Sequence, residues 1–243
     1  MILRRYVEGK EDWKRVRRAV LQHNLLGKRS TQRARHILEA VRRRFLRAPD
    51  WLPPARYVGR FGMLEAGAKC RENIVLAYLA AEDALFHDVL RESLSKLLSG
   101  DRAPLKRDII RIAASLRASA DENPPFWSPS MERRWAEGFL AIARRAGFIR
   151  ENGLGSFDRP LVRAEAFAFL FLWVYPREGS VRRTVRHRAF DPFLLTEEDC
   201  RRLLDDGRQR GWWGYTGTRA FVEMAPKPPT LEDWLDGLGQ GTL

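Results

Sequence analysis

The longest apolar run of the chain, AFAFLFLWVY at Ala166–Tyr175, constrains the fold more than any other feature. It holds ten residues, whereas a helix that crosses a membrane needs about 20. A helix that is apolar on every side is stable in water only when other parts of the chain cover it. We therefore expect a buried core helix over 163–175 and no membrane partner.

Length and composition favour a folded protein. The 243 residues are enough for one large domain or two small ones, and 44% hydrophobic with 11% aromatic content excludes a disordered chain. The two cysteines, Cys70 and Cys200, are 130 residues apart and form no CxxC motif, which excludes zinc ribbons and a disulfide framework. A reducing, cytoplasmic location fits this cysteine usage.

Apolar residues recur at helical spacing in at least seven segments, whereas only two short stretches have the pattern of β-hairpins. The expected fold is all-α, mainly helical and globular, with helix-turn-helix or winged-helix-like elements and one or two short hairpins. We divide the chain into a basic region 1–60, a helical core 61–175 with a winged-helix-like segment 104–162, and a region 176–243 with a helix, a small hairpin and a tail.

Two helices are expected in the first region, over Glu11–Leu26 and from residue 31 to about residue 47. Gly27 favours a stop after the first helix, and Ser30 or Thr31 suits the cap of the second. The second helix has one narrow apolar stripe, formed by Ala34, Ile37, Leu38, Val41 and Phe45. Two helices joined by a glycine-containing turn, the second rich in arginine, outline a helix-turn-helix.

The middle of the chain predicts two helices over Met63–Leu98 with a break near Glu82 or Asp83, and a third that opens at Pro104. Ser130 is the expected cap of a helix over 131–146. A hairpin around Gly153 and Gly155 follows it, in the order typical of a winged helix. A structural helix followed by an ordinary loop is the alternative.

The last third contains an expected exposed connection over 178–187 and a helix over 197–210 capped by Thr196. A small hairpin is expected from 212–215 and 220–224. The prolines and glycines after Pro226 indicate a tail with at most one helical turn, over 231–235.

Positive charge is concentrated at the N-terminus. The chain carries a formal net charge of +13, of which +12 lies in residues 1–60 and only +1 in the remainder. Clustered positive charge favours a polyanionic partner, because it displaces the counterions that surround nucleic acid. An arginine-rich genome and an organelle transit peptide are alternatives, and the folded-domain signals of this region disfavour the second.

Catalytic signatures are missing from the sequence. The four histidines have no HExxH spacing, and there is no GxxxxGK[ST] loop, no GxGxxG after a strand and no GxSxG. Adjacent acids such as Glu197 and Glu198 point to different sides of a helix and do not form a catalytic pair. We therefore expect no enzyme activity, no metal or other cofactor, and no small-molecule substrate.

The pattern NLLGKRST at 24–31, the pair Ile37 and Leu38, and RRRFL at 42–46 resemble the BrxA family, a small core component of BREX phage-defence systems. Residues 63–98 and the segment 128–149, which ends in AGFI, are also similar, so the resemblance covers about 11–175. It implies an all-helical protein that binds double-stranded DNA without known catalytic activity. It also implies the system's methyltransferase and other core proteins as partners.

The function predicted from these observations is phosphate-directed binding of double-stranded DNA. The resemblance supplies no contact residues, so charge and helix geometry select them: Lys28, Arg29, Ser30, Thr31, Arg33, Arg35, Arg42, Arg43, Arg47, Arg133 and Arg134. One alternative is an interaction subunit whose arginines meet acidic partner proteins. Another is an RNA-binding helical protein, although the chain lacks the aromatic pattern of RNA-recognition motifs.

Overall fold

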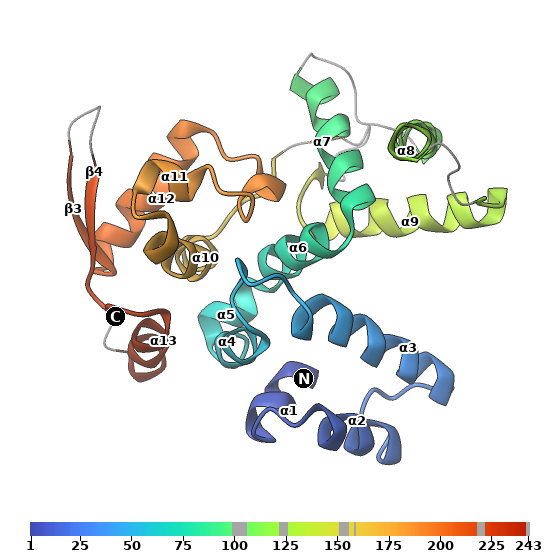
Figure 1. The fold of residues 1–243 in the computed structure, drawn as a ribbon, viewed down its shortest axis with the longest axis horizontal. Coiled ribbons are helices and arrows are strands. Elements are labelled where there is room, and N and C mark those ends of the chain that lie inside the picture. Colours follow the sequence, from blue (N-terminus) through green and yellow to red (C-terminus); the bar gives the residue numbers. More distant parts are fainter. Residues whose placement is uncertain (99–105, 122–125, 151–155, 158, 218–221, 242–243) are drawn as a thin grey trace. The chain divides into compact units, whose positions relative to one another are not determined.

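The computed structural model describes residues 1–98, 106–121, 126–150, 156–157, 159–217 and 222–241. Within these ranges the chain is mainly helical, with two short antiparallel strand pairs, which confirms the predicted fold class (Figure 1). By compactness it divides into two units. Unit 1 comprises residues 1–74, 163–191 and 195–243, and unit 2 comprises residues 75–162 and 192–194.

Unit 1 begins with a group of three helices, α1 (Ile2–Glu8), α2 (Trp13–Gln22) and α3 (Thr31–Val41), followed by the π-helical turn η1 (Arg42–Leu46). The small core that joins them consists of Ile2, Val16, Val20 and Leu38. Two further helices, α4 (Ala55–Phe61) and α5 (Glu65–Lys69), lead to α6 (Arg71–Glu82), which contributes residues to both units.

The apolar run forms the central helix of unit 1, α10 (Ala164–Glu178). Its residues from Ala166 to Leu172 are all buried, as expected for a core helix. Aromatic rings cover it from different elements: Phe61 of α4 stacks on Phe169 at 4.7 Å between ring centroids, and Phe190 packs on Phe167 at 5.3 Å. The helix thus joins early and late parts of the sequence into one core.

The C-terminal part of unit 1 contains α11 (Val181–Val185), α12 (Glu197–Gln209), the strands β3 (Trp213–Gly217) and β4 (Val222–Pro226), and α13 (Leu231–Gln240). Thr196 caps α12 as predicted, in a capping box with Asp199. The predicted second hairpin is present, with Trp213 opposite Pro226. The short 3-10 helix η2 (Asp191–Phe193), whose last two residues belong to unit 2, precedes α12.

Unit 2 is built from α7 (Ala84–Leu98), α8 (Lys106–Ala120), α9 (Pro129–Arg145) and the strands β1 (Ile149–Arg150) and β2 (Ser156–Phe157). Phe86 of α7 packs on Phe139 of α9, and Ile109 of α8 is fully buried. β1 and β2 pair antiparallel directly after α9, in the predicted order of parts. The expected turn at Gly153 and Gly155, like Pro104, lies outside the described residues.

Several boundaries differ from the prediction. The helix expected to be capped by Ser130 begins at Pro129 and is capped by Ser128, whose Oγ accepts from the Met131 amide at 3.4 Å. Proline suits the first helical turn because its missing N–H would have no partner there. The segment 63–98 contains α5 in addition to the two expected helices, which break at Asp83 as predicted.

The expected tail is a regular helix in the structure. Thr230 caps α13 by accepting from the Asp233 amide at 3.1 Å, and Trp234 of this helix is fully buried against Phe61 and Trp212. The prediction was wrong because it weighed the prolines and glycines above this cap and its apolar residues. Likewise, the connection expected over 178–187 contains the short helix α11.

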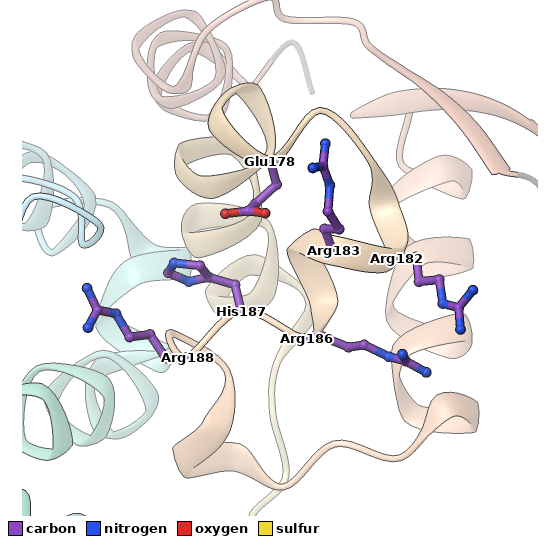
Figure 2. A pocket seen from close by; sticks show the side chains of 6 residues that line it. All are labelled: Glu178, Arg182, Arg183, Arg186, His187 and Arg188. Carbon is purple, nitrogen blue, oxygen red and sulfur yellow. The ribbon is translucent and has the colours of Figure 1, made fainter.

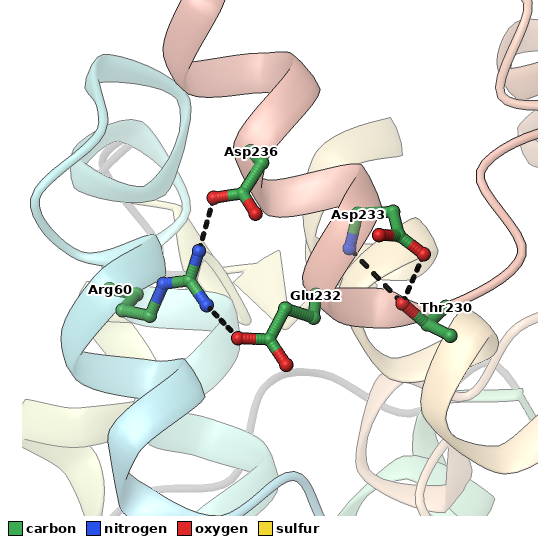
Figure 3. A network of polar contacts seen from close by, with 5 residues as sticks. All are labelled: Arg60, Thr230, Glu232, Asp233 and Asp236. Atoms are coloured by element: carbon green, nitrogen blue, oxygen red, sulfur yellow. Dashed lines mark hydrogen bonds and ion pairs between the residues drawn. The ribbon is translucent and has the colours of Figure 1, made fainter.

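Ion pairs add to the docking of α13. Arg60 of α4 donates to Glu232 at 2.8 Å and also to Asp236, so one guanidinium binds two carboxylates one helical turn apart (Figure 3). The Arg60 side chain is 25% exposed, whereas both carboxylates are more than half exposed. Solvent and salt therefore weaken this contact, and the buried Trp234 supplies most of the packing energy.

Arg60→Ala should lower the free energy of unfolding by about 1 kcal/mol at low salt, because it removes both ion pairs at once. The loss should shrink in 1 M NaCl, where charges are screened over about 3 Å. Urea unfolding at two salt concentrations measures both values. An equal loss at high and low salt would show that Arg60 acts through packing and not through charge.

Gly207 of α12 lies directly against the Trp213 ring. A Cβ atom at this position would stand 2.0 Å from a ring carbon of Trp213. The ring has no room to retreat, because its Nε1 donates to the Leu204 carbonyl at 2.9 Å and its face packs on Phe171. Glycine is thus required for α12 and β3 to approach each other.

Gly207→Ala should destabilise the protein by about 2 kcal/mol or more, since the added methyl group overpacks a fixed contact. Gly239→Ala in α13 is the matched control: its Cβ would make an ordinary contact at 3.6 Å with Leu64. There, the gain in helix propensity should leave stability unchanged or raise it by up to about 1 kcal/mol. Equal thermal midpoints for the two variants would contradict this account of Gly207.

Candidate nucleic-acid interface

The connection between α2 and α3 has a defined conformation. Asn24 has a positive φ of 43° and accepts from the Lys28 amide at 3.0 Å through its side chain, and Gly27 has φ 58°. Glycine tolerates this left-handed conformation without steric cost. The connection covers 23–30 and carries Lys28 and Arg29 in exposed positions just before α3.

The start of α3 is exposed, and its cap is Ser30, one of the two predicted residues. Ser30 accepts from the Arg33 amide at 3.4 Å, which leaves its O–H available to donate. Thr31 is the first helical residue and is exposed, as are Arg33 and Arg35. Ala34 is buried between the two arginines, so the predicted separation of arginines from the apolar stripe holds here.

The end of the predicted second helix is not a regular α-helix. The Arg47 amide donates to the Arg42 carbonyl at 3.1 Å, a bond across five residues that defines the wider π turn. Phe45 is buried despite this change, and Arg43 and Arg47 are exposed. Arg42 is half-buried and lies 3.8 Å from Glu39. Sequence periodicity at a fixed 100° per residue could not show this turn.

Further basic residues belong to the same group of helices. Lys14, Arg15, Arg17 and Arg18 of α2 are exposed, while Val16 and Val20 face the small core. These four residues were not among the predicted contacts, although they lie opposite the apolar residues of α2. Residues 13–49 hold twelve Lys or Arg against a single acid, Glu39. We call the exposed basic residues of α2, α3, η1 and their connection the N-terminal basic surface.

The second predicted element, α9, has less excess charge. Arg133 and Arg134 are exposed near its start, and Arg133 donates to the Pro129 carbonyl at 3.3 Å. Glu132 and Glu137 lie on the same turns. The hydrogen bond and charge of Lys106 lower the pKa of Glu137, with smaller contributions from the two arginines. Because acids offset these arginines, α9 is the weaker candidate for phosphate contact.

Both cysteines are buried and unsuited to nucleophilic chemistry. Burial, followed by the charge of Glu165, raises the pKa of Cys70 to about 12. Burial and the acids Asp199 and Glu197 raise that of Cys200 to about 11. Among the residues that the structure describes, no three His, Cys, Asp or Glu side chains are grouped so that they could hold a metal ion.

Both thiols should resist iodoacetamide at pH 8 in the folded protein. With their pKa values raised, both remain protonated at this pH, and only the thiolate reacts. Unfolding in guanidinium exposes them and returns their pKa values towards about 8.5, so labelling should accelerate strongly. Mass spectrometry with and without denaturant measures both rates. Rapid labelling of the folded chain at either position would contradict the burial of that thiol.

The fold and this surface define a mainly helical protein with a compact, strongly basic N-terminal group of helices. The chain belongs to the BrxA family, whose model matches residues 1–171, from the N-terminus into α10. This confirms the resemblance seen in the sequence and makes the chain a component of a BREX phage-defence system with further components.

No curated protein and no solved structure matches it. Over the described ranges, no helix is long and apolar enough to cross a membrane.

Proposed function

We propose that this BrxA-family protein binds double-stranded DNA through the N-terminal basic surface and acts by binding, without catalysis. The observation that carries the proposal is the charge ratio of residues 13–49, twelve basic residues against one acid, on helices with a core of their own. Such a surface attracts a polyanion over a distance and releases its counterions on contact. Its family supports a role in BREX defence.

The contacts we propose are mainly with phosphate groups. Arginine predominates among these residues, and its planar fork pairs with two phosphate oxygens while its charge is permanent. Exposed arginines occur in the connection, in α3 and in η1, and are not confined to one helix face. Phosphate contacts of this kind carry no base information, so the binding is largely sequence-tolerant.

The cell compartment and partners we propose follow from the same observations. Two buried free thiols suit a reducing cytoplasm. The BREX methyltransferase and other core proteins are the proposed protein partners, on the strength of the family. The competing function is that of an interaction subunit, which meets only these partner proteins and binds DNA incidentally. The following experiment distinguishes the two functions.

Replacing Arg42, Arg43 and Arg47 with Glu should weaken binding to all duplex sequences alike. If the wild type makes about five phosphate contacts, the logarithm of its affinity falls against the logarithm of salt concentration with a slope of about −4 to −5. Loss of three contacts should reduce this slope to about −2. Fluorescence anisotropy with two unrelated duplexes at several salt concentrations measures affinity and slope together.

The matched control replaces Arg91, Arg107 and Arg111, exposed on α7 and α8, with Glu. This variant changes the net charge by the same amount as the N-terminal variant. If binding depends on contact more than on total charge, its affinity for DNA should fall much less. Arg133→Glu with Arg134→Glu tests α9 in the same assay. Should the N-terminal variant keep wild-type affinity and slope while still capturing the methyltransferase in a pull-down, the interaction-subunit function replaces this one.

A further inference from the structure

A second group of arginines lines a depression in unit 1, after the residues that the family model matches. The depression is open, has a volume of about 470 Å³, and is lined by Glu178, Arg182, Arg183, Arg186, His187 and Arg188 (Figure 2). The volume is within the range of small-ligand sites, about 300–1,000 Å³. The sequence predicts only an exposed connection over 178–187.

Packing of the short helix α11 directs three of these arginines to the surface. Gly179 ends α10 with φ 66°, and Ser180 then accepts from the Arg183 amide at 3.3 Å and from Arg183 Nε at 3.4 Å. Val181 and Thr184 of α11 are buried, and the Thr184 hydroxyl donates to the Ser180 carbonyl at 2.8 Å. Since these two residues face inward, Arg182, Arg183 and Arg186 remain exposed.

Trp51 supports the other side of the depression. The Arg188 guanidinium lies over the Trp51 ring at 4.4 Å, and the His187 ring meets that ring edge-on at 5.6 Å. His187 Nδ1 accepts from the Ala189 amide at 3.2 Å, so in the neutral ring Nε2 carries the proton. Burial is the main cause that lowers the pKa of His187, with Arg188 and Arg177 acting in the same direction against Glu178 and Asp191.

The positive charge of the lining is poorly compensated. The lining residues include four arginines and a single carboxylate, that of Glu178. Arg186 lies 3.7 Å from Glu197, but both side chains are more than 60% exposed, so the pair is weak. Arg183 donates to a neutral hydroxyl and Arg188 packs on a ring, so neither contact cancels charge. The depression is therefore suited to an anion with more than one negative charge.

We propose that this depression binds a phosphate monoester, either on a nucleotide or on the 5′ end of a nucleic-acid strand. A monoester carries close to two negative charges at pH 7 and three acceptor oxygens, which suits the guanidinium groups of Arg182 and Arg186, whose side chains extend in the same direction (Figure 2). A phosphodiester in a duplex carries one charge per group and suits an extended surface. The site is thus distinct from the N-terminal basic surface and does not depend on the function proposed for it.

Isothermal titration calorimetry at constant ionic strength tests the site. The probes are adenosine 5′-monophosphate, inorganic phosphate and adenosine, together with one short single strand with and without a 5′ phosphate. Both phosphate compounds should bind, and adenosine should not. Tighter binding of the phosphorylated strand than of its 5′-hydroxyl form identifies a strand end as the source, and equal binding of the two strands identifies a free nucleotide or phosphate.

Arg182→Gln with Arg186→Gln should weaken the binding of adenosine 5′-monophosphate at least tenfold, because two charge-assisted hydrogen bonds are lost. Arg201→Gln with Arg202→Gln, exposed on α12, is the control with the same charge change and should bind as the wild type does. Unchanged thermal midpoints without ligand confirm that both variants fold.

Three results would overturn the proposal: no heat with either phosphate compound, equal affinity in the Arg182/Arg186 variant and the wild type, or tighter binding of a poly-glutamate peptide than of any phosphate probe. The last would identify acidic protein as the ligand. The Arg42/Arg43/Arg47 variant should keep its phosphate affinity, and the Arg182/Arg186 variant its duplex affinity. Failure of one site is therefore distinguishable from failure of the other.

Discussion

Burial of α10 on all sides is the constraint on which the rest of unit 1 depends. Phe167, Phe169 and Phe171 have no exposed surface, and each needs its own cover. Burial of one such ring stabilises the fold by about 1.5–3 kcal/mol. A surface helix, which buries only one face, could not gain this energy from rings on all its sides. The covering rings come from α4 before the helix and from β3 after it. Unit 1 is therefore assembled from separate parts of the chain, and unit 2 is formed largely by the residues between them.

The sequence predictions were accurate where a structure depends on residues close together in the sequence, and they failed where it depends on residues far apart. Ser30 and Thr196 cap helices as expected, because a cap is decided within four residues. The buried helix over the apolar run was equally predictable, because no other arrangement hides it from water. By contrast, α13 is stabilised by Trp234 against Phe61, a contact between residues 173 positions apart. Local sequence does not show this contact, and the glycines of the segment suggested a tail. Periodicity assumes a constant rotation per residue, so it could not predict the π turn at 42–46 either.

Whether a basic surface could be predicted from the sequence depended on the length of the segment over which charge was summed. Residues 1–60 are so basic that their sum shows the excess, and the exposed arginines of α3 and η1 followed from the apolar stripe. Residues 61–243 sum to only +1, which hid five arginines against one glutamate within 177–188. A twelve-residue window would have shown this second group. That its arginines remain exposed depends on the inward packing of Val181 and Thr184, which no count of charges contains.

Concentrated positive charge also has a structural cost, which the N-terminal helices must offset. Twelve basic residues within 13–49 repel one another over about 8–10 Å at physiological salt, and the segment contains a single acid, Glu39. The core of Ile2, Val16, Val20 and Leu38 is small, so its stability is sensitive to that repulsion. A bound polyanion removes the repulsion and stabilises the folded state by its own binding energy. The DNA binding that we propose for this region would therefore be linked to its stability through the same arginines, because a charge that is unfavourable in the free protein would become favourable in the complex.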